Sequence, residues 1–178
     1  MIIVSGFVRS GTSMMMRALS YGGMQIVSDE IRRSDRNNKH GYFELEKIGK
    51  KIQENNSYLD KFNSNQCIKV ISFFLENIKN IQNHSVIFMR RNMENIYASM
   101  EDMTGKKLSS EEKTSFNEHV SKVKRRLREH DNFVMVGFEE MLRNPKQELE
   151  KILNLIPDNF DIENAAGAVD VTISRHSS

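Results

Sequence analysis

The sequence predicts an α/β fold, in which layers of helices flank a central, mostly parallel sheet. Short apolar runs typical of strands alternate with segments whose apolar residues recur at helical spacing, and this alternation favours parallel strands joined by helices. The first strand-like run passes directly into a glycine-bearing loop and a helix. Parallel sheets bind ligands at such turns, so this stretch also predicts the place of a site.

The expected strands are short runs rich in Ile, Val, Phe and Met. They lie at residues 2–5, 24–27, 68–71, 86–89 and 133–136. Apolar residues at helical spacing predict helices at 13–21, 45–52, 74–81, 93–100, 116–127 and 149–156. Gly22 and Gly23 end the first helix, Pro145 stands where a helix can begin, and Pro157 ends the last one.

Length and composition predict a single domain over residues 1–178, which is long enough to bury a core without disulfides or metals. The one cysteine, Cys67, excludes an internal disulfide and fits a reducing compartment. The net charge is +2, and acidic and basic residues are well mixed along the sequence. The sequence therefore shows no basic patch of the kind that binds nucleic acid or an anionic membrane. No apolar run approaches the roughly 20 residues of a membrane span, and the N-terminal run is too short for a signal sequence. We therefore expect a cytoplasmic protein with neither nucleic acid nor membrane as a partner.

The loop after the first strand has the layout of a phosphate-binding P-loop, which makes the expected architecture a three-layer fold of the P-loop type. Gly6 and Gly11 flank four residues, and Thr12 and Ser13 open the helix. Glycines let backbone N–H groups turn toward an anion, and the helix N-terminus adds partial positive charge. The lysine of the usual G-x-x-x-x-G-K-[ST] form is absent, and the cation of the loop is Arg9. This substitution favours a phosphate-bearing donor other than the ATP of an ordinary ATPase.

A second group of residues follows the fourth predicted strand. That strand ends in Arg90 and Arg91, and Ser99 lies eight residues after Arg91 on the next helix. Together with the loop sequence Arg-Ser-Gly-Thr-Ser at 9–13, this stretch resembles the family of sulfotransferases that use 3′-phosphoadenosine 5′-phosphosulfate (PAPS). The segments at 38–44 and 134–145 resemble two further family segments, so the resemblance extends over residues 1–156.

The resemblance implies transfer of a sulfuryl group from PAPS to an acceptor hydroxyl or amine, with 3′-phosphoadenosine 5′-phosphate (PAP) as the product. The loop residues implied to hold the 5′-phosphosulfate are Arg9, Ser10, Gly11, Thr12 and Ser13. Arg9 would also stabilise the leaving group, and Arg91 and Ser99 would hold the 3′-phosphate. Glu44 would be the general base, with His40 as the alternative base and helix capping as the alternative role for Glu44.

The chain departs from the family where acceptors bind. It lacks the catalytic histidine segment and the C-terminal R-K-G-x-x-G-x-W segment of the cytosolic animal enzymes, and it has no tryptophan. The sequence identifies neither the acceptor, whether small molecule or glycan, nor the oligomeric state.

Two other functions stay open. One is a small P-loop kinase, for which Asp29 would be the Mg²⁺ ligand at a strand end. The other is a family member that binds a nucleotide without turnover. The five histidines and the cysteine show no metal-ligand spacing, so no metal site is predicted, and Glu139 is expected to pair with a nearby arginine.

Overall fold

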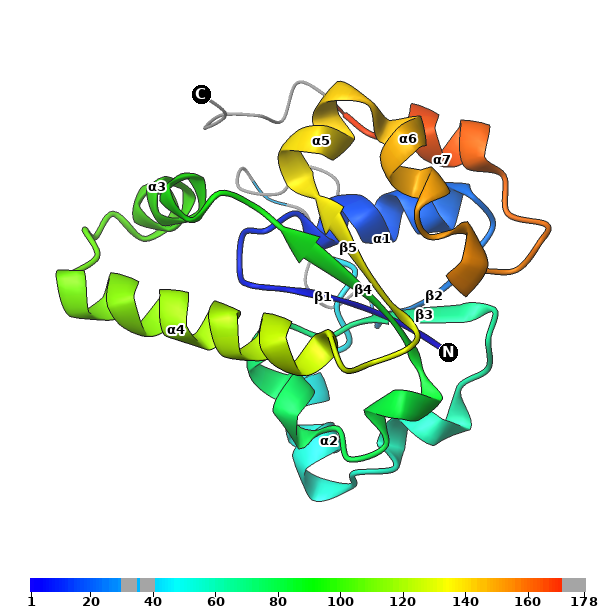
Figure 1. Ribbon diagram of the computed structural model, residues 1–178, viewed down its shortest axis with the longest axis horizontal. Helices are drawn as coiled ribbons and strands as arrows, with labels where there is room; N and C mark the ends of the chain where they lie inside the picture. The colour runs from blue at the N-terminus through cyan, green and yellow to red at the C-terminus, as the bar shows by residue number, and fades with distance from the viewer. Residues whose placement is uncertain (30–34, 36–40, 171–178) are drawn as a thin grey trace.

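The computed structural model describes residues 1–29, 35 and 41–170, and its centre is a five-stranded sheet (Figure 1). The strands, in order across the sheet, are β2 (Gln25–Val27), β3 (Gln66–Lys69), β1 (Ile2–Gly6), β4 (Ser85–Arg90) and β5 (Phe133–Gly137). All four pairings between neighbouring strands are parallel. The structure therefore confirms the α/β fold with a parallel sheet, and it places β1 between β3 and β4.

Helices cover both faces of the sheet. They are α1 (Thr12–Tyr21), α2 (Ile48–Glu54), α3 (Met93–Thr104), α4 (Ser110–Leu127), α5 (Phe138–Arg143), α6 (Pro145–Glu150) and α7 (Ile162–Gly167). One face packs against α2 and α4, and the other packs against α1, α6 and α7 (Figure 1).

Successive residues of the central strands face opposite layers, because side chains alternate along a strand. In β1, Ile2 and Val4 pack in the cluster that contains α1, whereas Ile3 packs in the cluster that contains α2 and α4. In β4, Ile87 and Val86 divide between the same two clusters. Because both faces are covered, these strands are continuous apolar runs in the sequence instead of alternating ones.

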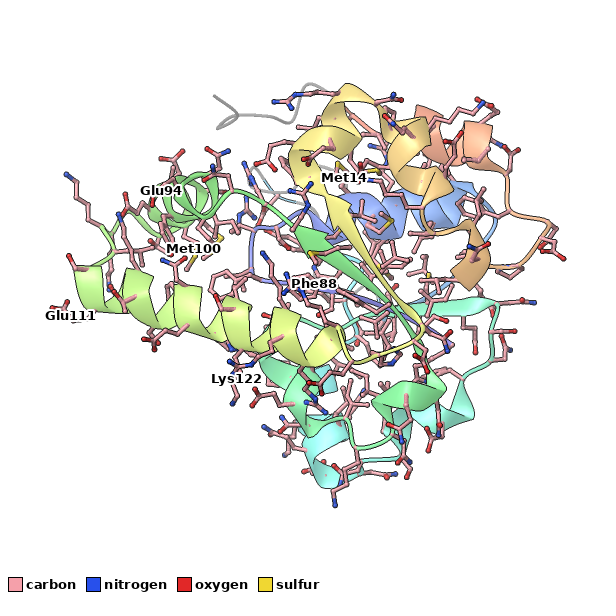
Figure 2. All side chains as sticks on the ribbon, in the orientation of Figure 1. Met14, Phe88, Glu94, Met100, Glu111 and Lys122 are labelled. Carbon is pink, nitrogen blue, oxygen red and sulfur yellow. The ribbon has the colours of Figure 1, made fainter. Side chains whose placement is uncertain are left out.

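Helices α3 and α4 turn their apolar residues toward each other and toward the loop after β1. Met100 of α3 lies between the two helices in Figure 2 and packs in a cluster around Phe7. The labelled Glu94, Glu111 and Lys122 point away into solvent (Figure 2). Both helices are thus amphipathic, and this pattern fixes which face α3 presents to the loop.

Two predicted helices are wrong. Residues 74–81 form 3₁₀ turns at Ser72–Asn77 and Ile81–Asn83, with an extended residue, Ile78, between them. The second error is at 149–156, where α6 ends at Glu150 and a 3₁₀ turn follows at Leu153–Leu155. Apolar residues three apart fit a 3₁₀ turn as well as an α-helix, so spacing alone does not separate the two.

Other differences are smaller. Helix α2 begins three residues after Leu45, and β3 ends at Lys69, two residues before the predicted end. Apolar spacing predicts neither α5 nor α7, because each has six residues and so fewer than two turns of a helical pattern. Of the polar, basic segment at 32–41, only residues 35 and 41 are among those described.

The thiol of Cys67 gives a direct test of this core. Cys67 is fully buried in β3, and burial raises its pKa to about 12. Because the thiolate is the reactive form, we expect the folded protein to resist a thiol reagent such as DTNB at pH 8, with labelling slowed about 10³-fold or more relative to the unfolded chain. The measurement is the labelling rate with and without 6 M guanidinium chloride. Rapid stoichiometric labelling of the folded protein would contradict the placement of β3 in the core.

Candidate active site

The loop after β1 is folded tightly against its neighbours. Gly6 has no room for a Cβ atom, which would overlap Ser10 Oγ and lie 2.8 Å from the carbonyl oxygen of Met89. Gly11 has φ +94°, and a Cβ atom there would overlap the ring of Phe138. These two positions therefore require glycine, one because of its packing and the other because of both its backbone and its packing.

The loop leads into the N-terminus of α1, which has the character of an anion site. Gly11 is the N-cap of α1, no side chain caps this helix end, and no acidic residue occupies its first turn. The N–H groups of a first helical turn lack intrahelical partners and carry partial positive charge. The side chain of Ser10 is buried in the loop, and its Oγ makes no hydrogen bond within the described residues. The N–H groups of this helix end fit the phosphosulfate that the family resemblance implies.

The structure brings together Arg9, Arg91 and Ser99, which come from three segments of the chain. Arg9 Nε donates a hydrogen bond to Ser99 Oγ at 2.9 Å, across 90 residues of sequence. Arg91 Nη1 donates to the carbonyl oxygen of Arg9 at 2.9 Å. Ser99 is buried in α3, on the side that faces the loop. Two cations and a hydroxyl therefore converge beside the N-terminus of α1.

Arg91 is held on three sides. Its guanidinium carbon lies 4.2 Å from the centre of the Phe138 ring, and its side chain is only 7% exposed. Burial lowers the pKa of Arg91, and the Glu139 carboxylate opposes this effect from 3.9 Å. Glu139 also accepts hydrogen bonds from the backbone N–H of Asn92 and the side chain of Asn95. Glu139 thus pairs with an arginine, as the sequence predicts.

On the other side of the loop, Lys69 forms a buried polar cluster that the sequence reasoning missed. Its Nζ donates to Glu44 Oε1 at 2.8 Å, to the carbonyl oxygen of Tyr42 at 3.0 Å and to Ser13 Oγ at 3.2 Å. Lys69 is 6% exposed, so its ammonium depends on these acceptors. The available signal was a lysine inside the apolar run from Cys67 to Val70. This cluster puts Glu44, the predicted base, next to the predicted donor loop.

The segment that carries Glu44 is anchored to the end of β2. Asp29 N–H donates to the carbonyl oxygen of Glu44 at 3.3 Å, and the Asp29 carboxylate accepts from Glu46 N–H at 2.6 Å. Asp29 is therefore engaged in positioning the backbone near Glu44. His40, the alternative base, lies outside the described residues.

Among residues 1–29, 35 and 41–170, no group of three or more acidic, histidine or cysteine side chains is placed to hold a metal ion. None of the helices in this same part of the chain has the length and apolar character needed to cross a bilayer.

Gly11 offers a test of the loop packing, with Gly23 as a matched control. Both glycines have φ near +95°, but a Cβ atom at Gly23 would meet nothing within 4 Å. We expect Gly23→Ala to cost about 1 kcal/mol from the backbone alone. Gly11→Ala should cost about 1–3 kcal/mol more, because of the overlap with Phe138. Urea unfolding measures both.

Adding Phe138→Ala to the Gly11→Ala variant should recover part of that difference, since it removes the overlap. Equal costs at the two glycines, or no recovery in the double variant, would contradict the packing of Phe138 against the loop.

Comparisons with known proteins identify the family and the fold. The family model described as "Sulfotransferase domain" matches residues 1–159. No curated protein matches the sequence. Among solved structures, the fold resembles that of sulfotransferase STF1 from Mycobacterium tuberculosis H37Rv, at 13% identity and a TM-score of 0.57, with 97% of this chain and 74% of that chain covered. That likeness shows the fold, and the family match over most of the sequence shows that this chain belongs to the sulfotransferase family.

Proposed function

We propose that this chain transfers a sulfuryl group from PAPS to a hydroxyl or amine of an acceptor. The observation that carries the proposal is the convergence of Arg9, Arg91 and Ser99 on an uncapped helix N-terminus behind a glycine loop. The donor carries anionic groups at both ends of its nucleoside, and the site offers cations and N–H groups at two adjacent places.

The loop would hold the phosphosulfate end of the donor. Backbone N–H groups from Ser10 to Thr12 and the hydroxyls of Thr12 and Ser13 would donate to its oxygens. Arg91 and Ser99 would hold the 3′-phosphate, since both lie beyond Arg9 on the β4 side of the loop. The Arg9–Ser99 hydrogen bond would link the two binding places, because each partner contacts one end of the donor.

In the transfer step, the acceptor oxygen or nitrogen bonds to sulfur while the bond from sulfur to the 5′-phosphate oxygen breaks. Negative charge then grows on that phosphate oxygen, and Arg9 would stabilise it. Lys69 lies on the opposite side of the loop and contacts Ser13, so its ammonium would stabilise the sulfuryl oxygens. Glu44 would receive the acceptor's proton, and Lys69 would hold the carboxylate in place for it.

Binding of PAP tests the donor site. We expect PAP to raise the melting temperature more than ATP with Mg²⁺ does, because a ligand of the folded state stabilises it in proportion to its affinity. Arg91→Ala should reduce the preference for PAP over AMP, which lacks the 3′-phosphate, about 10- to 100-fold, as expected for loss of a charged hydrogen bond. Thermal-shift and calorimetric titrations measure both effects.

Arg90→Ala is the matched control, because Arg90 adjoins Arg91 but pairs with Glu140 instead of the loop. Its preference for PAP should match that of the unmodified protein. A larger shift with ATP and Mg²⁺ would support the kinase alternative, and an undiminished preference in Arg91→Ala would remove Arg91 from the 3′-phosphate site.

Turnover tests Lys69 and Glu44. With PAPS and a panel of phenols, alcohols and amines, Lys69→Met should lower the rate about 10²- to 10³-fold while PAP affinity changes little. Glu44→Gln should lower it about 10²- to 10⁴-fold and remove the acidic limb of the rate–pH profile, because the amide cannot accept the proton. Lys122→Met is the control, since Lys122 forms a similar but exposed pair with Glu76 at 2.9 Å.

An active Glu44→Gln variant with an unchanged pH profile would exclude Glu44 as the base and favour His40. PAP binding without turnover of any acceptor, in a protein whose variants fold normally, would favour the non-catalytic alternative.

A further inference from the structure

A cavity of about 350 Å³ lies at the carboxyl ends of β4 and β5, outside the donor loop. It is open to solvent and is bordered by the ends of these strands, the start of α3, the last turn of α4 and helix α5 (Figure 1). The residues that line it are mostly charged or amide side chains: Arg90, Arg91, Asn92, Asn95, Lys124, Glu139, Glu140 and Arg143. None of the glycine-loop residues lines it.

The lining has an excess of positive charge. Four cationic side chains face two carboxylates, so two positive charges are left without a counterpart in the wall. Glu140 pairs with Arg90 at 2.7 Å, and both side chains are more than a third exposed to solvent. This one contact leaves other N–H donors of the Arg90 guanidinium available. In the described part of the chain, no carboxylate lies within ion-pair distance of Lys124 or Arg143.

The ammonium of Lys124 is destabilised by its surroundings, and a bound anion would offset this. Burial lowers the pKa of Lys124, and the charges of Arg90 and Arg128 lower it further. Two arginines next to a partly desolvated ammonium repel it, and an anion that accepts from Arg90 and Lys124 together would offset this repulsion.

Arg91 borders both the cavity and the donor loop. Arg91 is more than nine-tenths buried, yet its Nε makes no hydrogen bond, and the nearest carboxylate, Glu139, is 3.9 Å away. Arg91 uses Nη1 on the carbonyl oxygen of Arg9, toward the loop. Its guanidinium therefore lies between the loop and the cavity.

The cavity is also distant from the proposed site of transfer. Lys69 lies at the end of β3 and pairs with Glu44, whereas the cavity lies at β4 and β5, on the opposite side of β1. Three strand spacings separate β3 from β5, which is about 14 Å. A ligand group bound here is thus a different group from the one that receives the sulfuryl.

We propose that this cavity is a second anion site, in which Arg90, Lys124 and Arg143 bind a doubly charged oxyanion of the phosphate or sulfate class. Two uncompensated charges match a dianion, and arginine forks match its oxygens. The volume exceeds that of a free ion, so the oxyanion can be free or the charged end of a larger ester. The proposal does not depend on the sulfotransferase activity.

The test is titration with inorganic phosphate against potassium chloride at equal ionic strength, with and without saturating PAP, followed by thermal shift and calorimetry. We expect saturable phosphate binding that persists with PAP bound. The triple variant R90Q/K124Q/R143Q should bind phosphate at least 10-fold more weakly. Arg91 is not substituted in this variant, because it belongs to the proposed donor site. The control K106Q/K107Q/R125Q removes three charges from exposed positions and should bind as the unmodified protein does.

Loss of the phosphate response on PAP saturation would overturn the proposal, because the phosphate would then occupy the donor loop. Equal weakening in the two triple variants would also overturn it, since the effect would reflect only surface charge. If PAP fails to bind, the proposed function fails, but the comparison of the two triple variants still decides this site. Arg143→Gln alone, an exposed change, decides the matter if the triple variant unfolds. Tighter binding of glucose 6-phosphate than of inorganic phosphate would identify the ligand group as an ester, and equal binding would identify it as the free ion.

Discussion

The pairing of β1 with β3 on one side and β4 on the other is the constraint on which the whole site depends. Parallel register brings the carboxyl ends of all three strands to one edge, so the glycine loop is flanked by Lys69 at the end of β3 and by Arg91 just after β4. Neither cation would reach the loop if the strands were ordered differently. The sheet thus places positive charge on both sides of one helix N-terminus.

These charges are costly to bury, and the fold compensates each one locally. Lys69 has three acceptors from two segments of the chain, and Arg91 has an aromatic ring, a carbonyl oxygen and a carboxylate around it. Removal of water from an ion costs several kcal/mol unless such partners are present. Because the partners also fix the direction of each cation, little reorganisation is needed when an anion arrives, which is the condition for strong electrostatic stabilisation.

The sequence predicts the strands well because buried parallel strands are unbroken apolar runs. Arg9, Arg91 and Ser99 are each singled out by a motif in the sequence, but the hydrogen bonds that join them appear only in the structure. It does not predict the Lys69 cluster, because the partners of this buried lysine come from other segments of the chain. A single lysine at the end of an apolar run also looks like the exposed end of an ordinary strand. It also fails at 74–81, where spacing of apolar residues is shared by two kinds of helix. Local pattern determines local structure, whereas charge compensation is decided by the tertiary fold.

The backbone of Arg9 has a consequence for how this loop evolves. Arg9 has φ +64°, a left-handed conformation that costs a residue with a Cβ atom roughly 1 kcal/mol and costs glycine almost nothing. A sequence optimised for stability alone would carry glycine at position 9. The arginine therefore lowers folding stability slightly and places a positive charge in the loop. A substitution by glycine at this position would regain the stability and remove that charge.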